Sequence, residues 1–248
     1  VNPSKPVTGL GSVKCVTDKS ILAGLPEGDG AVMIPCGAHI ALPIPSVLSD
    51  NPSRPYTIAM KVRFKDFDHY NCLLNMPADN RQDSIAFLER NAYPFLSLKL
   101  REPKTTGTRG GFYPGEWVRL VFQFGEKQTR VLLDGREICA QDVALAGSRA
   151  DCSKAGGYFL LSADNNGDDS EMYWADVKVY DGVVMPEDCP EVPAAAPPTG
   201  ELLSHLSFDD HGNDGLNALK VKGGRDASVR VNPSKPVTGL GSVKCVTD

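Results

Sequence analysis

An exact repeat of eighteen residues constrains this chain more than any other feature. The segment Val1–Asp18, VNPSKPVTGLGSVKCVTD, returns unchanged at Val231–Asp248, so the offset between the copies is 230 residues. Diverged duplications lose sequence identity while they keep the apolar pattern, so a perfect copy favours a window cut from a longer tandem array. An engineered permutation that copied a strand to close the fold is the alternative. Under both interpretations the chain holds one domain, cut inside itself.

The composition is that of an ordinary globular domain. Hydrophobic residues make up 41% of the chain and aromatic residues 7%, and a unit of this length can bury a substantial core. The net charge is −5, with acids and bases mixed along the chain, so we expect no nucleic-acid partner. The apolar runs are far shorter than the ~20 residues of a spanning helix, so we expect no membrane insertion. No signal peptide precedes Val1, and we expect any native leader to be missing from this sequence.

The cysteines predict an oxidising, extracellular or cell-surface location. Cys15 and Cys245 are one position of the repeat, which leaves six cysteines per unit, the others being Cys36, Cys72, Cys139, Cys152 and Cys189. An even set favours disulfides, whereas the absence of a CxxC pair argues against zinc. We expect Cys15 or Cys245 to pair with Cys36, Cys139 with Cys152, and Cys72 with Cys189. Six buried thiols are the alternative.

Alternating apolar and polar residues predict an all-β fold. A strand is expected at Tyr56–Phe64, where every second side chain from Ile58 to Phe64 is apolar, and Trp117–Phe124 alternates in the same way. Asp134-Gly135 suits the two positive-φ positions of a type I′ turn, so a hairpin is expected there. Other strands are expected at 31–34, 38–44, 72–75, 85–88, 95–100, 129–133, 136–139, 158–163, 173–180 and 202–208. About a dozen short strands without a long amphipathic helix favour two antiparallel sheets packed face to face, or a closed barrel.

A proline-rich segment divides the chain. Met185–Gly200, MPEDCPEVPAAAPPTG, holds five prolines and is typical of a semi-rigid spacer. We therefore expect a β-sandwich over residues 1–184 that lacks its first strand, an inter-repeat linker over 185–200, and the opening strands of the next repeat over 201–248. The missing strand would come from Leu202–Phe208 of the same chain or of a neighbour.

Four motifs carry a resemblance to a known family. They are LSHLSFDD at 203–210, the Trp-led strand at 117–124 with the LDGR turn at 133–136, LLSADNNGDD at 160–169, and MYWADVKVYDG at 172–182. With Leu202–Phe208 placed first, their order resembles the laminin G-like jelly roll of the concanavalin A-like lectin and glucanase superfamily. The resemblance implies a two-sheet antiparallel jelly-roll β-sandwich.

Calcium sites are common in that superfamily. Asp164, Asn165, Asp168 and Asp169 present crowded oxygen atoms that would suit a structural Ca²⁺ ion. Clusters of Asn, Asp and Gly also form ordinary tight turns, which is the alternative. We expect no cofactor to be required.

A sugar-binding face is a further expectation. Strict alternation along the final strand places Trp174, Asp176 and Tyr180 on one face with Lys178, opposite Val177 and its apolar neighbours. The two rings could stack on a sugar there. The alternative is that they cover the sheet or pack beneath a loop.

Catalysis is the least favoured of the functions considered for this chain. Retaining glycosidases need two carboxylates about 5–5.5 Å apart, and alternation places Glu171 and Asp176 on opposite faces. The E-x-D-x-E pattern of the related glucanases is absent.

The repeat favours a non-enzymatic structural or adhesive unit of an extracellular tandem-repeat protein that assembles head to tail with identical repeats into a surface filament. A glycan-binding lectin module is the alternative, and a glycoside hydrolase is third.

Overall fold

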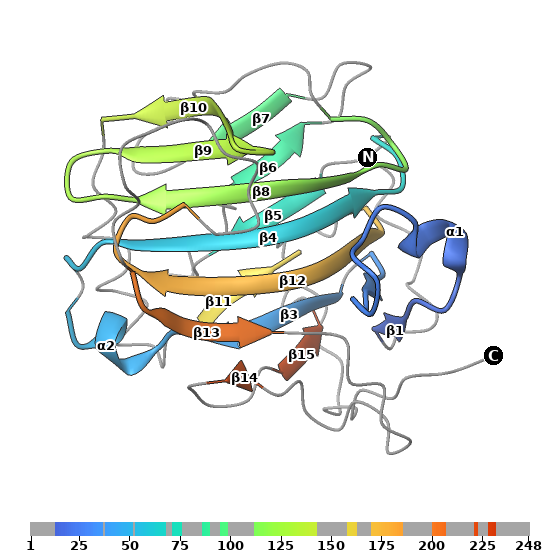
Figure 1. Ribbon diagram of the computed structural model, residues 1–248, viewed down its shortest axis with the longest axis horizontal. Helices are drawn as coiled ribbons and strands as arrows, with labels where there is room; N and C mark the ends of the chain where they lie inside the picture. Colours follow the sequence, from blue (N-terminus) through green and yellow to red (C-terminus); the bar gives the residue numbers. More distant parts are fainter. Residues whose placement is uncertain are drawn as a thin grey trace.

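The chain folds into two antiparallel β-sheets packed face to face, as seen in a computed structural model (Figure 1). The structure describes residues 13–36, 38–51, 53–67, 71–75, 86–89, 95–98, 112–142, 158–162, 170–185, 200–206, 221–222 and 228–231. Two helices of four residues, α1 (Lys19–Leu22) and α2 (Ser46–Ser49), lie outside the sheets. Within these ranges no helix is long and apolar enough to cross a membrane.

Among the described residues, nine strands form the larger sheet. In hydrogen-bonded order its main path is β1 (Lys14–Cys15), β2 (Val32–Ile34), β12 (Met172–Asp181), β4 (Tyr56–Phe64), β8 (Trp117–Phe124), β9 (Thr129–Leu133) and β10 (Arg136–Gln141). The remaining two strands are β13 (Leu202–Leu206), which pairs with β12, and β14 (Val221–Lys222), which pairs with β13. Strands far apart in sequence are therefore neighbours at the centre of the sheet.

The smaller sheet, in the part of the chain that the structure describes, has six strands. Their order is β15 (Ser228–Val231), β3 (Ala38–Pro43), β11 (Tyr158–Leu161), β5 (Asn71–Asn75), β6 (Ala86–Glu89) and β7 (Phe95–Leu98). The expected strands were therefore located correctly to within a few residues, and the predicted β-sandwich of two antiparallel sheets is confirmed.

The core lies between the sheets and is built by the alternation that the sequence shows. Ile58, Met60, Val62 and Phe64 on β4 are fully buried, and the alternate apolar residues of β8 join the same core. Tyr56 adds an aromatic contact to Phe124, with ring centroids 4.5 Å apart. Burial of such side chains contributes roughly 1.5–3 kcal/mol each.

The β9–β10 hairpin is confirmed at its turn. Asp134 and Gly135 have φ values of 47° and 80°, both in the left-handed region that a type I′ turn requires. Asp134 also accepts a hydrogen bond from the backbone N–H of Arg119 through Oδ1, at 2.8 Å. The turn is thereby fixed to the neighbouring strand β8.

The face assignment of β12 was wrong for Tyr173, Trp174 and Ala175, which precede a bulge in the strand. The pairing of β12 with β4 shifts register between Ala175 and Lys178, and Asp176 has a φ of 50°. One extra residue reverses the alternation along the strand. Trp174 therefore faces the core with no exposed surface, together with Val177, while Asp176 and Lys178 face outward.

The C-terminal strands complete both sheets of their own chain. β13 pairs with the second half of β12, and β15 pairs over its whole length with β3, from Ser228–Ala41 to Val231–Ala38. Of the two sources expected for the missing strand, the structure uses the same chain. Figure 1 shows these strands, in orange and red, beside β12 and β3.

Candidate functional site

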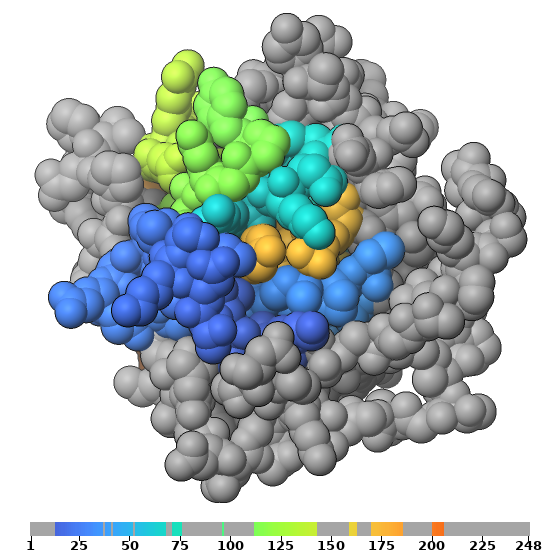
Figure 2. Space-filling view, turned by 90° about the vertical axis from the view of Figure 1, so that its right-hand side faces the viewer, coloured from blue at the N-terminus to red at the C-terminus, as the bar shows by residue number. Residues whose placement is uncertain are grey.

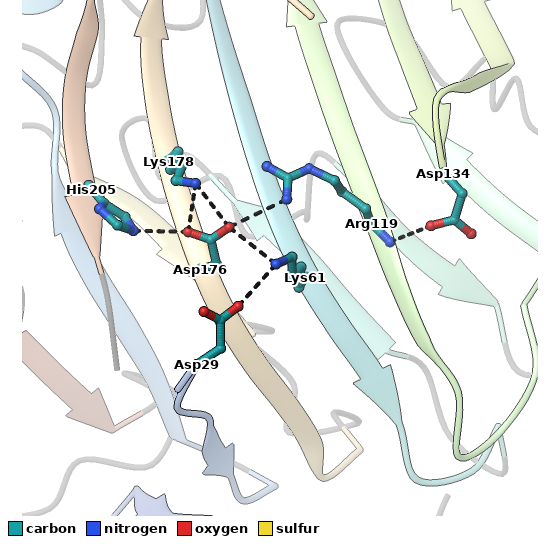
Figure 3. Close-up of polar contacts among 7 residues, drawn as sticks. All are labelled: Asp29, Lys61, Arg119, Asp134, Asp176, Lys178 and His205. Carbon is teal, nitrogen blue, oxygen red and sulfur yellow. Dashed lines mark hydrogen bonds and ion pairs between the residues drawn. The ribbon is translucent and has the colours of Figure 1, made fainter. Parts of the chain in front are cut away.

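The outward face of the nine-stranded sheet carries a polar cluster between two apolar patches. We call it the Asp176 cluster, and its members are Asp29, Lys61, Arg119, Asp176, Lys178 and His205 (Figure 3). Lys61 comes from β4, Arg119 from β8, Asp176 and Lys178 from β12, and His205 from β13. Asp29 belongs to the turn before β2. Residues spread over most of the sequence therefore meet on one face.

One apolar patch lies beneath the N-terminal segment. Val16, Ala31 and Ala175 are buried together, and Trp117 packs against them. The indole Nε1 of Trp117 donates to the carbonyl of Ile21 at 2.7 Å, which fixes the end of α1 to the sheet. Figure 2 shows this end of the molecule, where the blue N-terminal residues lie against green and cyan parts of the sheet.

The other apolar patch lies beneath the chain that leaves β12. Ala59, Val121 and Leu132 are buried there, with Tyr180 and Met185 packed against them. The segment that follows is held by buried polar side chains. Thr57 Oγ1 donates to the carbonyl of Gly182 at 2.9 Å, and Gln123 Nε2 donates to the carbonyl of Val184 at 2.9 Å.

Asp176 lies at the centre of the cluster. Its carboxylate is 2.9 Å from His205 Nε2, 3.1 Å from Lys178 Nζ, 3.4 Å from Arg119 Nη1 and 3.6 Å from Lys61 Nζ. Lys61 also contacts Asp29 at 3.2 Å. One carboxylate thus gathers cationic or hydrogen-bonding groups from four neighbouring strands.

The bulge in β12 creates this arrangement. β2 pairs with β12 as far as Trp174, and β13 begins to pair at Val177. Asp176 lies between these two pairings, at the junction of the N-terminal and C-terminal parts of the chain. Its left-handed backbone, which aspartate tolerates better than most residues, lets two successive residues beside the bulge reach the same face.

The cluster is only partly open to solvent. The Arg119 side chain is 5% exposed and that of Asp176 is 12% exposed, whereas His205 reaches 27%. Burial raises the pKa of Asp176, but hydrogen bonds from His205 and Lys178 outweigh burial and hold the pKa well below its usual range. Asp176 is therefore a permanent anion that positions its neighbours, and His205 and Lys178 are the more accessible polar groups.

A second ion pair lies where β12 ends. Arg54 binds Asp181 through both Nε and Nη2. The hydrogen bond from Arg54 lowers the pKa of Asp181. This pair is separate from the Asp176 cluster and fixes the loop before β4 to the end of β12.

The residues predicted for sugar binding are not all brought together. Asp176 is the centre of the cluster, and Tyr180 is half-buried over the apolar patch at Ala59. Trp174 is a core residue, so the prediction that its ring faces solvent is wrong. The pattern missed Asp29, Lys61 and Arg119 as partners of Asp176, because strict alternation places residues on a face but does not give the strand order.

The predicted calcium ligands Asp164, Asn165, Asp168 and Asp169 lie outside the described residues. In the part of the chain that the structure describes, no group of three or more His, Cys, Asp or Glu side chains is placed to hold a metal ion. The calcium site stays a prediction.

The predicted disulfide pairings stay predictions. Cys15 is disulfide-bonded, and Cys72 and Cys139 are buried. Cys15 is the register partner of Val32, and Cys36 lies four residues farther along, past the end of β2. Disulfides need Cα atoms within about 7 Å, which chain spacing alone does not give. Cys152, Cys189 and Cys245 lie outside the described residues.

Comparison with known proteins supports the fold. No protein-family model matches the chain, and no curated protein matches its sequence. A candidate carbohydrate-binding protein from Bacteroides ovatus matches in structure with a TM-score of 0.50 at 11% identity, over 81% of this chain and 61% of that one. This chain therefore spans about three fifths of that protein's length.

Two further solved structures match with lower scores. A heptameric SAP-like pentraxin from Limulus polyphemus gives a TM-score of 0.49 at 11% identity, over 85% of this chain and 99% of that one. A Trypanosoma rangeli sialidase gives 0.47 at 13% identity, over 62% and 26%. At such identities a likeness concerns the fold alone. The chain is a jelly-roll β-sandwich.

Proposed function

We propose that this chain is a lectin-like, non-enzymatic glycan-binding module, and that the Asp176 cluster is its binding site. The observation that carries the proposal is the placement of charged donors and acceptors, partly exposed, between two apolar patches that contain aromatic rings. Ligand sites of proteins commonly combine a mainly apolar surface with a few well-placed polar groups. The likeness to a candidate carbohydrate-binding protein supports the same class of ligand.

The chemistry of the cluster suits hydroxyl groups. Lysine and histidine N–H groups donate to sugar oxygens, and carboxylates accept from sugar hydroxyls. Asp176 fixes His205 and Lys178 in place, so little side-chain freedom would be lost on binding. Tyr180 and Trp117, half-buried at the two ends of the cluster, offer ring surface for the apolar face of a sugar.

The same contacts argue against catalysis at this site. A general acid must be protonated near the working pH, whereas the partners of Asp176 hold its pKa below the usual range. The carboxylate of Asp29 lies on the far side of a shared partner, because Lys61 Nζ contacts both Asp29 and Asp176. These contacts support a binding role.

A glycan array followed by isothermal titration tests the proposal. We expect the chain to bind at least one saccharide, and the variants His205→Asn and Lys178→Gln to lose at least tenfold in affinity while they keep the fold. Lys65→Gln is the matched control, because Lys65 pairs with Glu171 at 3.3 Å outside the cluster and is 55% exposed. Equal binding by all three variants would contradict the assignment of the site.

The exact repeat favours a second role as one unit of an extracellular, laminin G-like tandem array that forms a surface filament. Native mass spectrometry and electron microscopy of the source material test this role. Masses at multiples of about 230 residues, or fibres with a regular axial repeat, would support it. A single mass near 26.6 kDa would contradict it.

Two further features belong to this proposal. Disulfides that include Cys15 would stabilise the unit outside the cell, and non-reduced peptide mapping would give their partners. The loop at 164–169 would hold Ca²⁺, and a rise in melting temperature with added CaCl₂ that EDTA reverses would support this site.

A further inference from the structure

We propose that the C-terminal strands of one copy also dock onto a second copy of this chain. The part concerned, here called the closing segment, consists of the strands β13 (Leu202–Leu206) and β15 (Ser228–Val231). Its docking surface is the edge formed by the second half of β12 together with β3. The partner is thus the same segment from another molecule, or from the next unit of an array.

The closing segment is attached at the edges of both sheets. β13 pairs antiparallel with β12 from Val177–Leu206 to Tyr180–Leu202, and β15 pairs antiparallel with β3. These contacts are backbone hydrogen bonds of strand addition, which a segment from another copy makes equally well. Identical chains offer identical surfaces, so nothing in the interface distinguishes self from neighbour.

Apart from His205, whose Nε2 is 2.9 Å from Asp176, side chains add little to hold the described part of β13 in place. Leu203 is only partly buried against the core, and Leu202 is 38% exposed. Ser204 is buried, yet its hydroxyl makes no hydrogen bond to the part of the chain that the structure describes. Docking therefore depends mainly on backbone pairing, which favours reversible release.

The connection to the rest of the chain permits exchange. Gly200 lies against Val184 and the carbonyl of Asp181, so both ends of the connection meet in the closed form. The residues between them, 186–199, hold five prolines. A proline-rich chain of this length spans roughly 40 Å when extended, at about 3.1 Å per residue. That reach is enough to carry β13 onto a neighbouring molecule.

The repeat makes the choice of acceptor ambiguous. β15 ends at Val231, and the copy of Val1–Asp18 begins at that same residue. In an array, each closing segment would therefore lie between two domains that could accept it. The proline-rich connection would link it to the domain before it, and the repeated residues would link it to the domain after it. Both acceptors present the same β12 and β3 edges.

Exchange would also carry part of the candidate site. His205 lies on β13 and is 2.9 Å from Asp176 on β12. An exchanged segment would complete the Asp176 cluster of the molecule that receives it. The docking proposal does not depend on glycan binding, although the shared residue would couple the two.

Two single-cysteine variants test the exchange. Lys178 and His205 are register partners on β12 and β13, and both side chains are partly exposed. Lys178→Cys and His205→Cys chains are mixed in equal amounts, incubated at a range of concentrations and treated with a short bismaleimide. Each variant alone is the control for the native cysteines, and the double variant Lys178→Cys/His205→Cys reports bridging within one chain.

We expect the mixture to yield at least five times as much covalent dimer as either variant alone, and this yield should rise with protein concentration. Peptide mapping of the dimer should give a peptide bridged between positions 178 and 205. A mixture no richer in dimer than its controls, while the double variant is bridged as a monomer, would overturn the proposal. If either variant fails to fold, the register pair Tyr180 and Leu202 replaces it, with the same two outcomes. Loss of glycan binding alone would leave this result unaffected.

Discussion

Replacement of Asp176 with asparagine removes one negative charge from the centre of the cluster and almost none of its volume. Asparagine also tolerates the left-handed backbone of this position, where φ is 50°. The variant Asp176→Asn therefore isolates the effect of charge. Three cationic side chains, those of Lys61, Lys178 and Arg119, would lose their shared carboxylate.

The expected cost follows from burial. The side chains of Asp176 and Arg119 are 12% and 5% exposed, so solvent replaces the lost contacts poorly. Removing one partner of a buried ion pair costs about 3–5 kcal/mol, and the amide of asparagine would keep part of the hydrogen bonding. We expect a loss of about 2–4 kcal/mol in the free energy of unfolding, or roughly 4–16 °C in Tm for a domain of this size.

The same residue sets a pH dependence. Asp176 has a folded pKa below its unfolded value of about 3.9, so its contribution to stability is present above the unfolded pKa and is lost as the pH falls through the folded pKa. Urea unfolding at pH values from 7 to 2.5 measures this effect. The wild-type chain is expected to lose stability below about pH 4 more steeply than Asp176→Asn.

The matched control is Asp134→Asn, another aspartate with left-handed backbone, whose exposed side chain accepts a hydrogen bond that asparagine can also accept. It should change stability by less than about 0.5 kcal/mol. Equal stability of Asp176→Asn and the wild-type chain at pH 7 would refute the role of Asp176 as the organising charge.

Three further substitutions test the packing around the site. Gly200→Ala places a Cβ 2.1 Å from Val184 Cγ1 and 2.3 Å from the Asp181 carbonyl oxygen. We therefore expect the free energy of unfolding to fall by about 1–3 kcal/mol and hydrogen exchange in β13 to become faster. Glu201→Ala, at an exposed neighbouring residue, is the control and should change neither. Trp174→Ala empties a core position and should cost about 3–5 kcal/mol by chemical denaturation; a small loss would place the ring outside the core. Trp117→Phe removes the hydrogen bond to Ile21, and a loss of about 1 kcal/mol with faster proteolysis within residues 16–31 is expected, whereas unchanged proteolysis would count against the anchor.

The strands were predictable from sequence because their signals are local. Tyr56–Phe64 and Trp117–Phe124 were located at their observed ends, since strict alternation of apolar side chains marks a strand with one face on a core. The turn at Asp134-Gly135 was equally predictable, because few residue pairs adopt two successive positive φ values without strain.

The candidate site was only partly predictable, because it depends on non-local pairing. Lys61, Arg119 and Asp176 meet because β4 lies between β12 and β8, an order that periodicity does not reveal. The bulge at Asp176 was also missed, and it moved Trp174 from the expected outer face into the core. One extra residue in a strand leaves no strong sequence signal when aspartate takes the unusual backbone position.

The outer face of the nine-stranded sheet is partly covered, which made the faces of its strands harder to assign from sequence. Its two ends are covered by chain from residues 16–31 and 181–185, so apolar residues such as Ala59 and Val121 are buried on the face that alternation marks as polar. When both faces of a sheet are covered, apolar residues occur on both sides of each strand, so the sequence does not show which face points to the core. The charged residues left between the two coverings mark the candidate site.

Mapping of a bound saccharide by NMR tests the central claim most directly. The array identifies the saccharide, which is then titrated into the ¹³C,¹⁵N-labelled wild-type chain. We predict that the largest shift changes occur at the ring of His205 and at Lys178, with smaller changes at Tyr180 and none at the distant ion pair of Lys65 with Glu171. Shift changes confined to other parts of the surface, or a chain that binds no saccharide, would contradict the account.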